Sequence, residues 1–299
     1  MKKLSVLAVF AAALLTAGLS SCSKVKMVGT SGEPCKLSLQ ANTVDISANR
    51  VSASKATTEP LPENTTIGVH VVDLTSGESL STAAITNVKY SADASGALNK
   101  TDASTPVILT TGYTYDVYAY SPHNAGVTAE TSSAVPVTHG TDVLWAKTAG
   151  EQPNTSTHTT NLSFEHKMAQ ISFRVVADGA SNPDITGATI KVTGFSKEGT
   201  LDLATGEITP GSVDNTIEIT DIETPICFIP SSQPMELNVT VTIPNGANAG
   251  TYTGVKRGTF TPGRSTVITV TVIDRNSSLG LEAGMVPWET VTDDIEVNN

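Results

Sequence analysis

The segment MELNVTVTIP, residues 235–244, indicates the fold class most clearly. Its apolar residues stand at every second position and are separated by Asn238, Thr240 and Thr242. Successive side chains of a β-strand point to opposite faces, so this spacing predicts a strand with one buried face and one polar face. Its valines and threonines favour the same structure, because β-branched residues fit a pleated sheet.

Most of the chain repeats this pattern. Similar alternation runs through TIGVHVVDL (66–74), GYTYDVYAYSP (112–122), AQISFRVVA (169–177), ATIKVTGF (188–195), TIEITDI (216–222) and RSTVITVTVID (264–274). Residues 36–47 predict a further strand or two, and the polar residues 48–65 predict a loop. No long window keeps an apolar period of 3.6 residues, so at most short helical turns are expected. The sequence predicts an all-β protein of antiparallel sheets packed as sandwiches.

The domain organisation follows from length and one polar stretch. The chain has 299 residues, of which 39% are hydrophobic, enough for one large or two ordinary domains. The stretch TAGEQPNTSTHTT, residues 148–160, has no apolar pattern and predicts a linker. We therefore expect one β-sandwich domain over residues 51–155 and a second over residues 156–299.

The N-terminus predicts export. Lys2 and Lys3 precede an apolar run, Leu4–Leu15, that is too short to span a membrane. Residues 1–21 are therefore expected to be a signal peptide. The run ends in LSSC, residues 19–22, which resembles a bacterial lipobox and predicts lipidation of Cys22. The alternative is an ordinary signal peptide followed by a chance cysteine.

Charge and cysteine content exclude several functions. A net charge of −11 argues against a nucleic-acid partner, which requires basic patches. Cys35 and Cys227 remain after lipidation and make no disulfide framework, although one bridge between them is possible in an exported protein. No metal-ligand spacing occurs, and no cofactor is expected.

The sequence offers no recognisable catalytic constellation. The five histidines, His70, His123, His139, His158 and His166, have no partner at a known ligand spacing. Neither a nucleophile elbow nor a phosphate-binding loop is found. A pair of carboxylates brought together by folding stays open, since spatial neighbours cannot be read from sequence. The prediction is a protein that is not an enzyme.

Several segments in order resemble the Bacteroidetes fimbrillin family, the subunits of lipoprotein-derived (type V) pili. They are the lipobox, GYTYDVYAYSP (112–122), DVLWAK (142–147), LSFEHKMAQISFRV (162–175), GTLDLATGEIT (199–209), CFIPSS (227–232) and VPWET (286–290). The most specific part is the F-x-H-x-x-A pattern of Phe164, His166 and Ala169. The resemblance implies two tandem transthyretin-like Greek-key β-sandwich domains.

The resemblance also implies a route of maturation. Signal peptidase II would remove the signal peptide, and the lipid on Cys22 would anchor the precursor to the outer membrane. A trypsin-like, arginine-specific protease would then remove an N-terminal strand. A strand of another pilus subunit would fill the groove, which is β-strand addition. Residues 22–50 are then a lipidated propeptide, and the product belongs to a surface pilus that supports adhesion.

Arg50 is the candidate cleavage site. It is the only arginine in the first 173 residues and lies in a segment with loop character, where proteases can bind an extended chain. Cleavage there would make Val51 the new N-terminus. The alternatives are a solvated loop arginine without this role, or cleavage at Lys55.

The C-terminal segment WETVTDDIEVNN, residues 288–299, is the candidate donor strand. Val291, Ile295 and Val297 offer apolar side chains, and Ile295 and Val297 keep the spacing of two. The alternative is a final strand of the second domain.

A rival hypothesis is an outer-membrane surface lipoprotein that binds glycans through aromatic side chains. It requires Tyr118, Tyr120 or Trp145 to line an open face. The other explanation for these aromatics is packing in a core.

Overall fold

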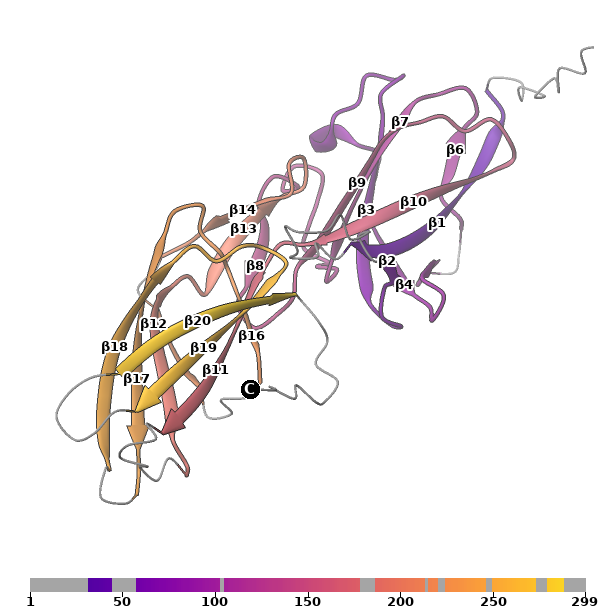
Figure 1. Ribbon diagram of the computed structural model, residues 1–299. Coiled ribbons are helices and arrows are strands. Elements are labelled where there is room, and N and C mark those ends of the chain that lie inside the picture. Colours follow the sequence, from indigo (N-terminus) through magenta and orange to yellow (C-terminus); the bar gives the residue numbers. More distant parts are fainter. Residues whose placement is uncertain are drawn as a thin grey trace, which may run out of the picture.

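The computed structural model describes residues 32–44, 58–102, 105–177, 186–212, 215–219, 224–245, 249–272 and 279–287. Strands are the main element of this part of the chain, and its one helical element is a 3-10 turn, η1 (Leu80–Thr82). Figure 1 shows an elongated molecule with a large sheet at one end and two smaller sheets at the other. The prediction of an all-β protein is confirmed.

The N-terminal end is a nine-stranded sheet that closes on itself. Its path is β10 (Thr157–His166), β9 (Leu144–Glu151), β7 (Tyr115–Ser121), β3 (Thr66–Asp73), β4 (Ile85–Ala92), β5 (Ala97–Lys100), β1 (Pro34–Val44) and β2 (Thr58–Pro60), with β6 (Ile108–Thr110) paired to β1. Because β1 also pairs with β10, the path returns to its first strand. The enclosed core includes Ile67, Val69, Val117 and Phe164.

The C-terminal end consists of two four-stranded sheets. One has the order β16 (Ile226–Phe228), β11 (Ala169–Ala177), β19 (Arg264–Val272) and β20 (Leu279–Pro287). The other has the order β15 (Asn215–Ile219), β12 (Thr189–Phe195), β17 (Met235–Ile243) and β18 (Gly250–Gly258). The alternating residues of β17, Leu237, Val239, Val241 and Ile243, are all buried in the core between these sheets. The segment that decided the fold class therefore forms the predicted two-faced strand.

A third, three-stranded sheet joins the two ends. It has the order β14 (Glu207–Pro210), β13 (Glu198–Asp202) and β8 (Val135–Thr138). Since β8 precedes the closed sheet's last strands and β13 follows them, their antiparallel pairing connects segments about sixty residues apart in sequence. Val135, Val137, Met168 and Leu201 form a separate buried cluster there. The ends of the molecule thus share a core and a sheet in addition to the chain that connects them.

Two sequence-based expectations, about a loop and about strand pairing, are wrong. The stretch at residues 148–160 is not a continuous loop, because its ends belong to β9 and β10 of the closed sheet. The chain passes between sheets at Lys167 and Met168 instead. The sheets are also not purely antiparallel, since β1 pairs with β10, and β11 with β19, in parallel. The division into domains over 51–155 and 156–299 stays a prediction.

Trp145 packs against Gly206 at this junction. The indole Nε1–H of Trp145 donates a hydrogen bond to the Leu203 carbonyl at 2.9 Å, and the ammonium of Lys167 lies 4.6 Å from the ring centroid. Gly206 has a positive φ of 72°, and a Cβ built there would lie 2.6 Å from the Trp145 ring. No other residue type meets both conditions without displacing the indole.

Replacing Gly206 by alanine is therefore expected to lower the free energy of unfolding by about 1–3 kcal/mol, through backbone strain and the clash with Trp145. Chemical denaturation monitored by tryptophan fluorescence measures this. Gly77→Ala is the matched control, because Gly77 has a similar φ of 75° and open space around its Cβ position. Equal losses in the two variants would show that Trp145 packing contributes nothing.

Candidate functional site

The candidate site is the position of β1 in the closed sheet, which we call the β1 site. On one side, residues Lys36–Thr43 pair in parallel with Thr157–Phe164 of β10. On the other side, β1 pairs antiparallel with β6, β5 and β2 in turn. Figure 1 shows β1 and β10 side by side along their length. Strand β1 is therefore hydrogen-bonded along both edges and completes the closed sheet.

The inner face of β1 carries four buried side chains, which are small, large, large and small in chain order. Cys35, Leu37, Leu39 and Ala41 are 0%, 4%, 3% and 0% exposed. Two large residues thus lie between two small ones, at every second position. Complete burial of each leucine contributes about 1.5–3 kcal/mol relative to exposure. This face is what holds β1 in the core.

The walls of the β1 site are apolar along most of their length. On β10, Leu162 lies opposite Ala41 and Phe164 opposite Thr43, and both are fully buried. Across the other edge, the buried residues Leu98 and Leu109 lie opposite Leu39 and Cys35. Without β1, these apolar surfaces and the unpaired backbone of β10 would be uncovered.

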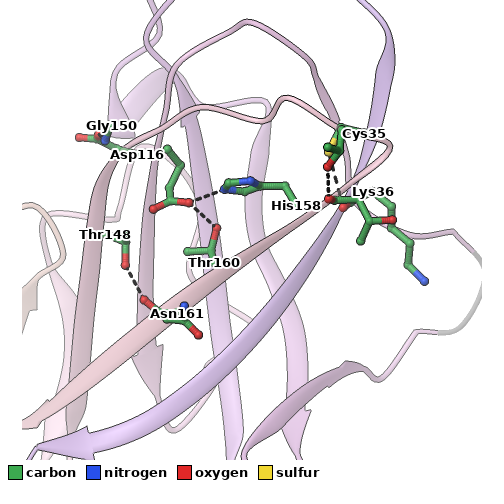
Figure 2. Close-up of polar contacts among 11 residues, drawn as sticks. Cys35, Lys36, Asp116, Thr148, Gly150, His158, Thr160 and Asn161 are labelled. Atoms are coloured by element: carbon green, nitrogen blue, oxygen red, sulfur yellow. Dashed lines mark hydrogen bonds and ion pairs between the residues drawn. The ribbon is translucent and has the colours of Figure 1, made fainter. Parts of the chain in front are cut away.

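A polar cluster lies at the N-terminal half of the site. One carboxylate oxygen of Glu151 accepts a hydrogen bond from the Thr160 hydroxyl at 3.1 Å and contacts Nε2 of His158. Figure 2 shows His158 and Thr160 pointing toward this common carboxylate. In the parallel register, Leu37 lies opposite His158 and Leu39 opposite Thr160. The β10 wall therefore changes from polar to apolar along the strand.

A second polar group fixes the neighbouring strands β7 and β9. Asp116 accepts a hydrogen bond from the Gly150 backbone N–H at 3.0 Å and forms an ion pair with Lys147 at 3.7 Å. The Lys147 ammonium lies 4.8 Å from the centroid of the Tyr118 ring. The contact with Tyr118, and then the charge of Asp116, raise the pKa of Lys147. The amine thus stays protonated and is no nucleophile.

The two described cysteines are free thiols. Burial raises the pKa of Cys35, and it raises the pKa of Cys227 to about 12. A thiol with a raised pKa holds little thiolate at neutral pH, so neither group is suited to nucleophilic chemistry. Within the described residues, no group of three or more His, Cys, Asp or Glu side chains is arranged to bind a metal ion. In this same part of the chain, no helix has the length and apolarity needed to cross a membrane.

His70 is a buried titratable group in β3. Its side chain is fully buried, Nδ1 lies 2.7 Å from the Thr86 hydroxyl, and Nε2 has no hydrogen-bond partner among the described residues. Desolvation lowers the pKa of His70 to about 4. The folded protein therefore holds His70 neutral.

This predicts a loss of stability in mild acid. Between pH 6.5 and about 4 the unfolded chain binds a proton at His70 that the folded chain does not, so the free energy of unfolding falls as pH decreases through this range. Urea denaturation at several pH values measures the slope. The His70→Gln variant, which keeps a hydrogen-bonding group for Thr86 but cannot titrate, is expected to show a shallower slope. Identical slopes would exclude His70 as a source of the pH dependence.

The F-x-H-x-x-A pattern lies where the chain leaves the closed sheet. Phe164 is buried in the N-terminal core, and Ala169 begins β11 in the C-terminal core. Between them, Nδ1 of His166 lies 2.8 Å from the Asp142 carboxylate. Met168 is fully buried in the cluster at the junction. The six residues from Phe164 to Ala169 thus contribute side chains to three different cores.

The structure does not place the tyrosines of β7 on an open face. Tyr118 and Tyr120 are 7% and 1% exposed, and the Tyr120 hydroxyl donates a hydrogen bond to Asn87 at 2.7 Å. Trp145 is partly buried by its contacts at the junction. The expectation of the glycan-binding hypothesis is wrong for both tyrosines, because each packs into a further buried cluster on the second face of β7.

The other predicted site residues lie outside the described part of the chain. They are the lipidation site Cys22, the cleavage site residues Arg50 and Val51 with the alternative Lys55, and the donor-strand residues Val291, Ile295 and Val297. Sequence reasoning found the strand that is now β1 but missed its parallel pairing with β10. The alternation of Thr160, Leu162 and Phe164 was the available signal for a second strand with a buried face.

Comparisons with known proteins identify a family and several solved structures that resemble this chain. A family model described as fimbrillin-like matches residues 54–288. No curated protein matches the chain significantly in sequence. Among solved structures, a Bacteroides ovatus protein assigned to cell adhesion has a TM-score of 0.66 at 18% identity, covering 87% of this chain and 99% of that one.

Two further structures share the fold. A Bacteroides uniformis protein, also assigned to cell adhesion, has a TM-score of 0.63 at 16% identity and covers 85% of this chain and 98% of that one. A fimbrial assembly protein from Parabacteroides distasonis has a TM-score of 0.50 at 12% identity, with 85% and 99% coverage. At these identities the likeness concerns the fold.

Proposed function

Because the chain belongs to the fimbrillin-like family, we propose that it is a structural subunit of a cell-surface fimbria that assembles by strand replacement at the β1 site. A protease cleaves after Arg50 and releases the segment that contains β1. A C-terminal segment of another subunit then occupies the vacated position. The subunit supports adhesion as part of the fibre and has no catalytic role.

The observation that carries this proposal is the place of β1 in the closed sheet. It lies N-terminal to Arg50, pairs along both edges, and inserts four alternating side chains into the core. Its loss would leave an apolar groove bounded by two unpaired strand edges, which is the surface that an added strand recognises. The incoming strand restores both backbone pairing and core packing, so the joint resembles part of a fold.

The maturation route follows from the N-terminal sequence. Signal peptidase II cleaves before Cys22, which receives the lipid and anchors the precursor to the outer membrane. A trypsin-like protease with arginine specificity then separates residues 22–50, with the lipid, from the assembling subunit. The remaining partners are further pilus subunits, either copies of this chain or accessory fimbrillins.

Mass spectrometry of the surface form tests the cleavage. We expect a chain that begins at Val51 and carries no lipid. Arg50→Ala is expected to retain residues 22–50 and to abolish the oligomer ladder on denaturing gels, because β1 stays in place. Lys55→Ala is the matched control and should process normally.

A surface chain that begins at lipidated Cys22 and still forms fibres would contradict the proposal. A surface chain that begins after Lys55 would show that the protease cleaves there, and would still be consistent with strand replacement.

A further inference from the structure

The inner face of β1 has a counterpart elsewhere in the sequence. Leu37, Leu39 and Ala41 form the pattern L-x-L-x-A, which occurs at one other place in the chain, at Leu279, Leu281 and Ala283. The match extends one position further, since Ser277 corresponds to Cys35 and is a small residue as well. The second pattern therefore reproduces the order small, large, large, small that the β1 site holds.

The second pattern lies in β20, the last described strand. Strand β20 is at the end of its four-stranded sheet and, within the described residues, pairs on one side only, with β19. Its Leu279–Pro287 segment runs antiparallel to β19 along its whole length. An edge strand near the C-terminus can leave its sheet without breaking a strand on its other side.

The residues that follow β20 fit the β1 site less well. If Ile295 and Val297 took the positions of Leu37 and Leu39, Asp293 would take the position of Cys35 and Asn299 that of Ala41. Both positions are fully buried. Burying a carboxylate or amide without a fixed partner is unfavourable, so this register is disfavoured.

Resting on the proposed function, we propose that the strand that replaces β1 is β20 of a second copy of this chain. It runs parallel to β10, with Leu279, Leu281 and Ala283 in the positions of Leu37, Leu39 and Ala41. The donor is thus the L-G-L-E-A segment and not residues 291–297. The chain then carries both the acceptor and its matching donor, which permits assembly from copies of itself.

The exchange gains backbone pairing for β20. Among the described strands, β20 pairs along one edge in its own sheet, whereas the β1 site offers β10 on one side and β6, β5 and β2 on the other. Each added backbone hydrogen bond contributes about 1 kcal/mol net, and the apolar walls of the site are covered again. The size match ensures that this gain needs no repacking of the acceptor core.

The proposed register makes a specific contact testable. Gln40 lies opposite Asn161 of β10, on the outer face of the sheet. In the proposed register Glu282 takes the position of Gln40, so Glu282 of the donor lies opposite Asn161 of the acceptor. Paired residues on neighbouring strands have Cα atoms about 5 Å apart, which suits a disulfide.

The experiment uses three cysteine pairs in the full chain, produced in the native cell. Chains carrying Glu282→Cys are coexpressed with chains carrying Asn161→Cys, so that any disulfide between these positions joins two subunits. Asn298→Cys with Asn161→Cys tests the rival register of residues 291–297. Gln40→Cys with Asn161→Cys in one chain reports whether β1 still occupies its site. Disulfide-linked peptides are identified by mass spectrometry of assembled fibres.

The expected result is a disulfide for the Glu282 pair, little or none for the Asn298 pair, and no Gln40 disulfide in assembled fibres, because chains locked by that bond keep β1 in place and do not assemble. A disulfide for the Asn298 pair alone overturns the assignment of β20 but keeps strand replacement. Fibres that contain neither the Gln40 disulfide nor an intersubunit disulfide also overturn it, because another polypeptide then fills the site. Fibres that retain the Gln40 disulfide overturn the proposed function itself.

Discussion

Replacing Phe164 by alanine is expected to lower the free energy of unfolding by about 3–5 kcal/mol, in the precursor and in the assembled subunit alike. Phe164 is fully buried in the N-terminal core and lies opposite Thr43 of β1. The substitution removes its apolar contacts and leaves a cavity that the surrounding strands cannot close. Strand β10 stays in the chain after cleavage, so the loss does not depend on processing.

Urea denaturation of the precursor and thermal dissociation of the fibre measure the two effects. Phe164→Leu is the matched control, because it keeps an apolar side chain and should lose much less stability. A normal fibre built from Phe164→Ala subunits would show that this wall of the β1 site is not needed in the polymer.

Replacing Leu39 by alanine is expected to cost about 2–5 kcal/mol in the uncut precursor and nothing in the assembled subunit. The side chain is 3% exposed and lies opposite Leu98 across the core edge. Its removal creates a cavity only while β1 occupies the site. After cleavage the residue is gone, and the replacing strand supplies its own side chain at this position.

The comparison requires denaturation of precursor and fibre from the same variant. Ser38→Ala, on the outer face of β1, is the matched control and should change neither form appreciably. An equal loss in both forms would mean that β1 remains in the assembled protein, in contradiction to strand replacement. Faster cleavage of the Leu39→Ala precursor is a further expected result, since a weakened strand opens more often.

Local sequence pattern was sufficient to identify most strands. In β17 the apolar alternation corresponds to alternating burial. In β7 the two faces pack into different buried clusters. Both outcomes follow because successive side chains of a strand point to opposite faces. The open face expected for Tyr118 and Tyr120 failed for another reason. Alternation shows that two faces differ, but it cannot show that a second core covers the polar one.

The order of strands in the sheets could not be predicted from the sequence, for a related reason. Strands β1 and β10 are more than one hundred residues apart, and no local signal specifies their parallel pairing. The polar stretch at residues 148–160 was misread because exposed strand ends, such as Thr157 and Thr159, have the composition of loops. The candidate site arises from these long-range pairings, so its walls could not be listed in advance, whereas a strand within residues 36–47 could be predicted.

The parallel register between β1 and β10 also bears on mechanical strength. A force pulling along a strand in this position acts on the hydrogen bonds of eight residue pairs at the same time. Such a shearing geometry resists tension better than one in which a strand is peeled away bond by bond. Whichever strand occupies the β1 site parallel to β10 is therefore held in the orientation that best withstands flow or traction along its axis.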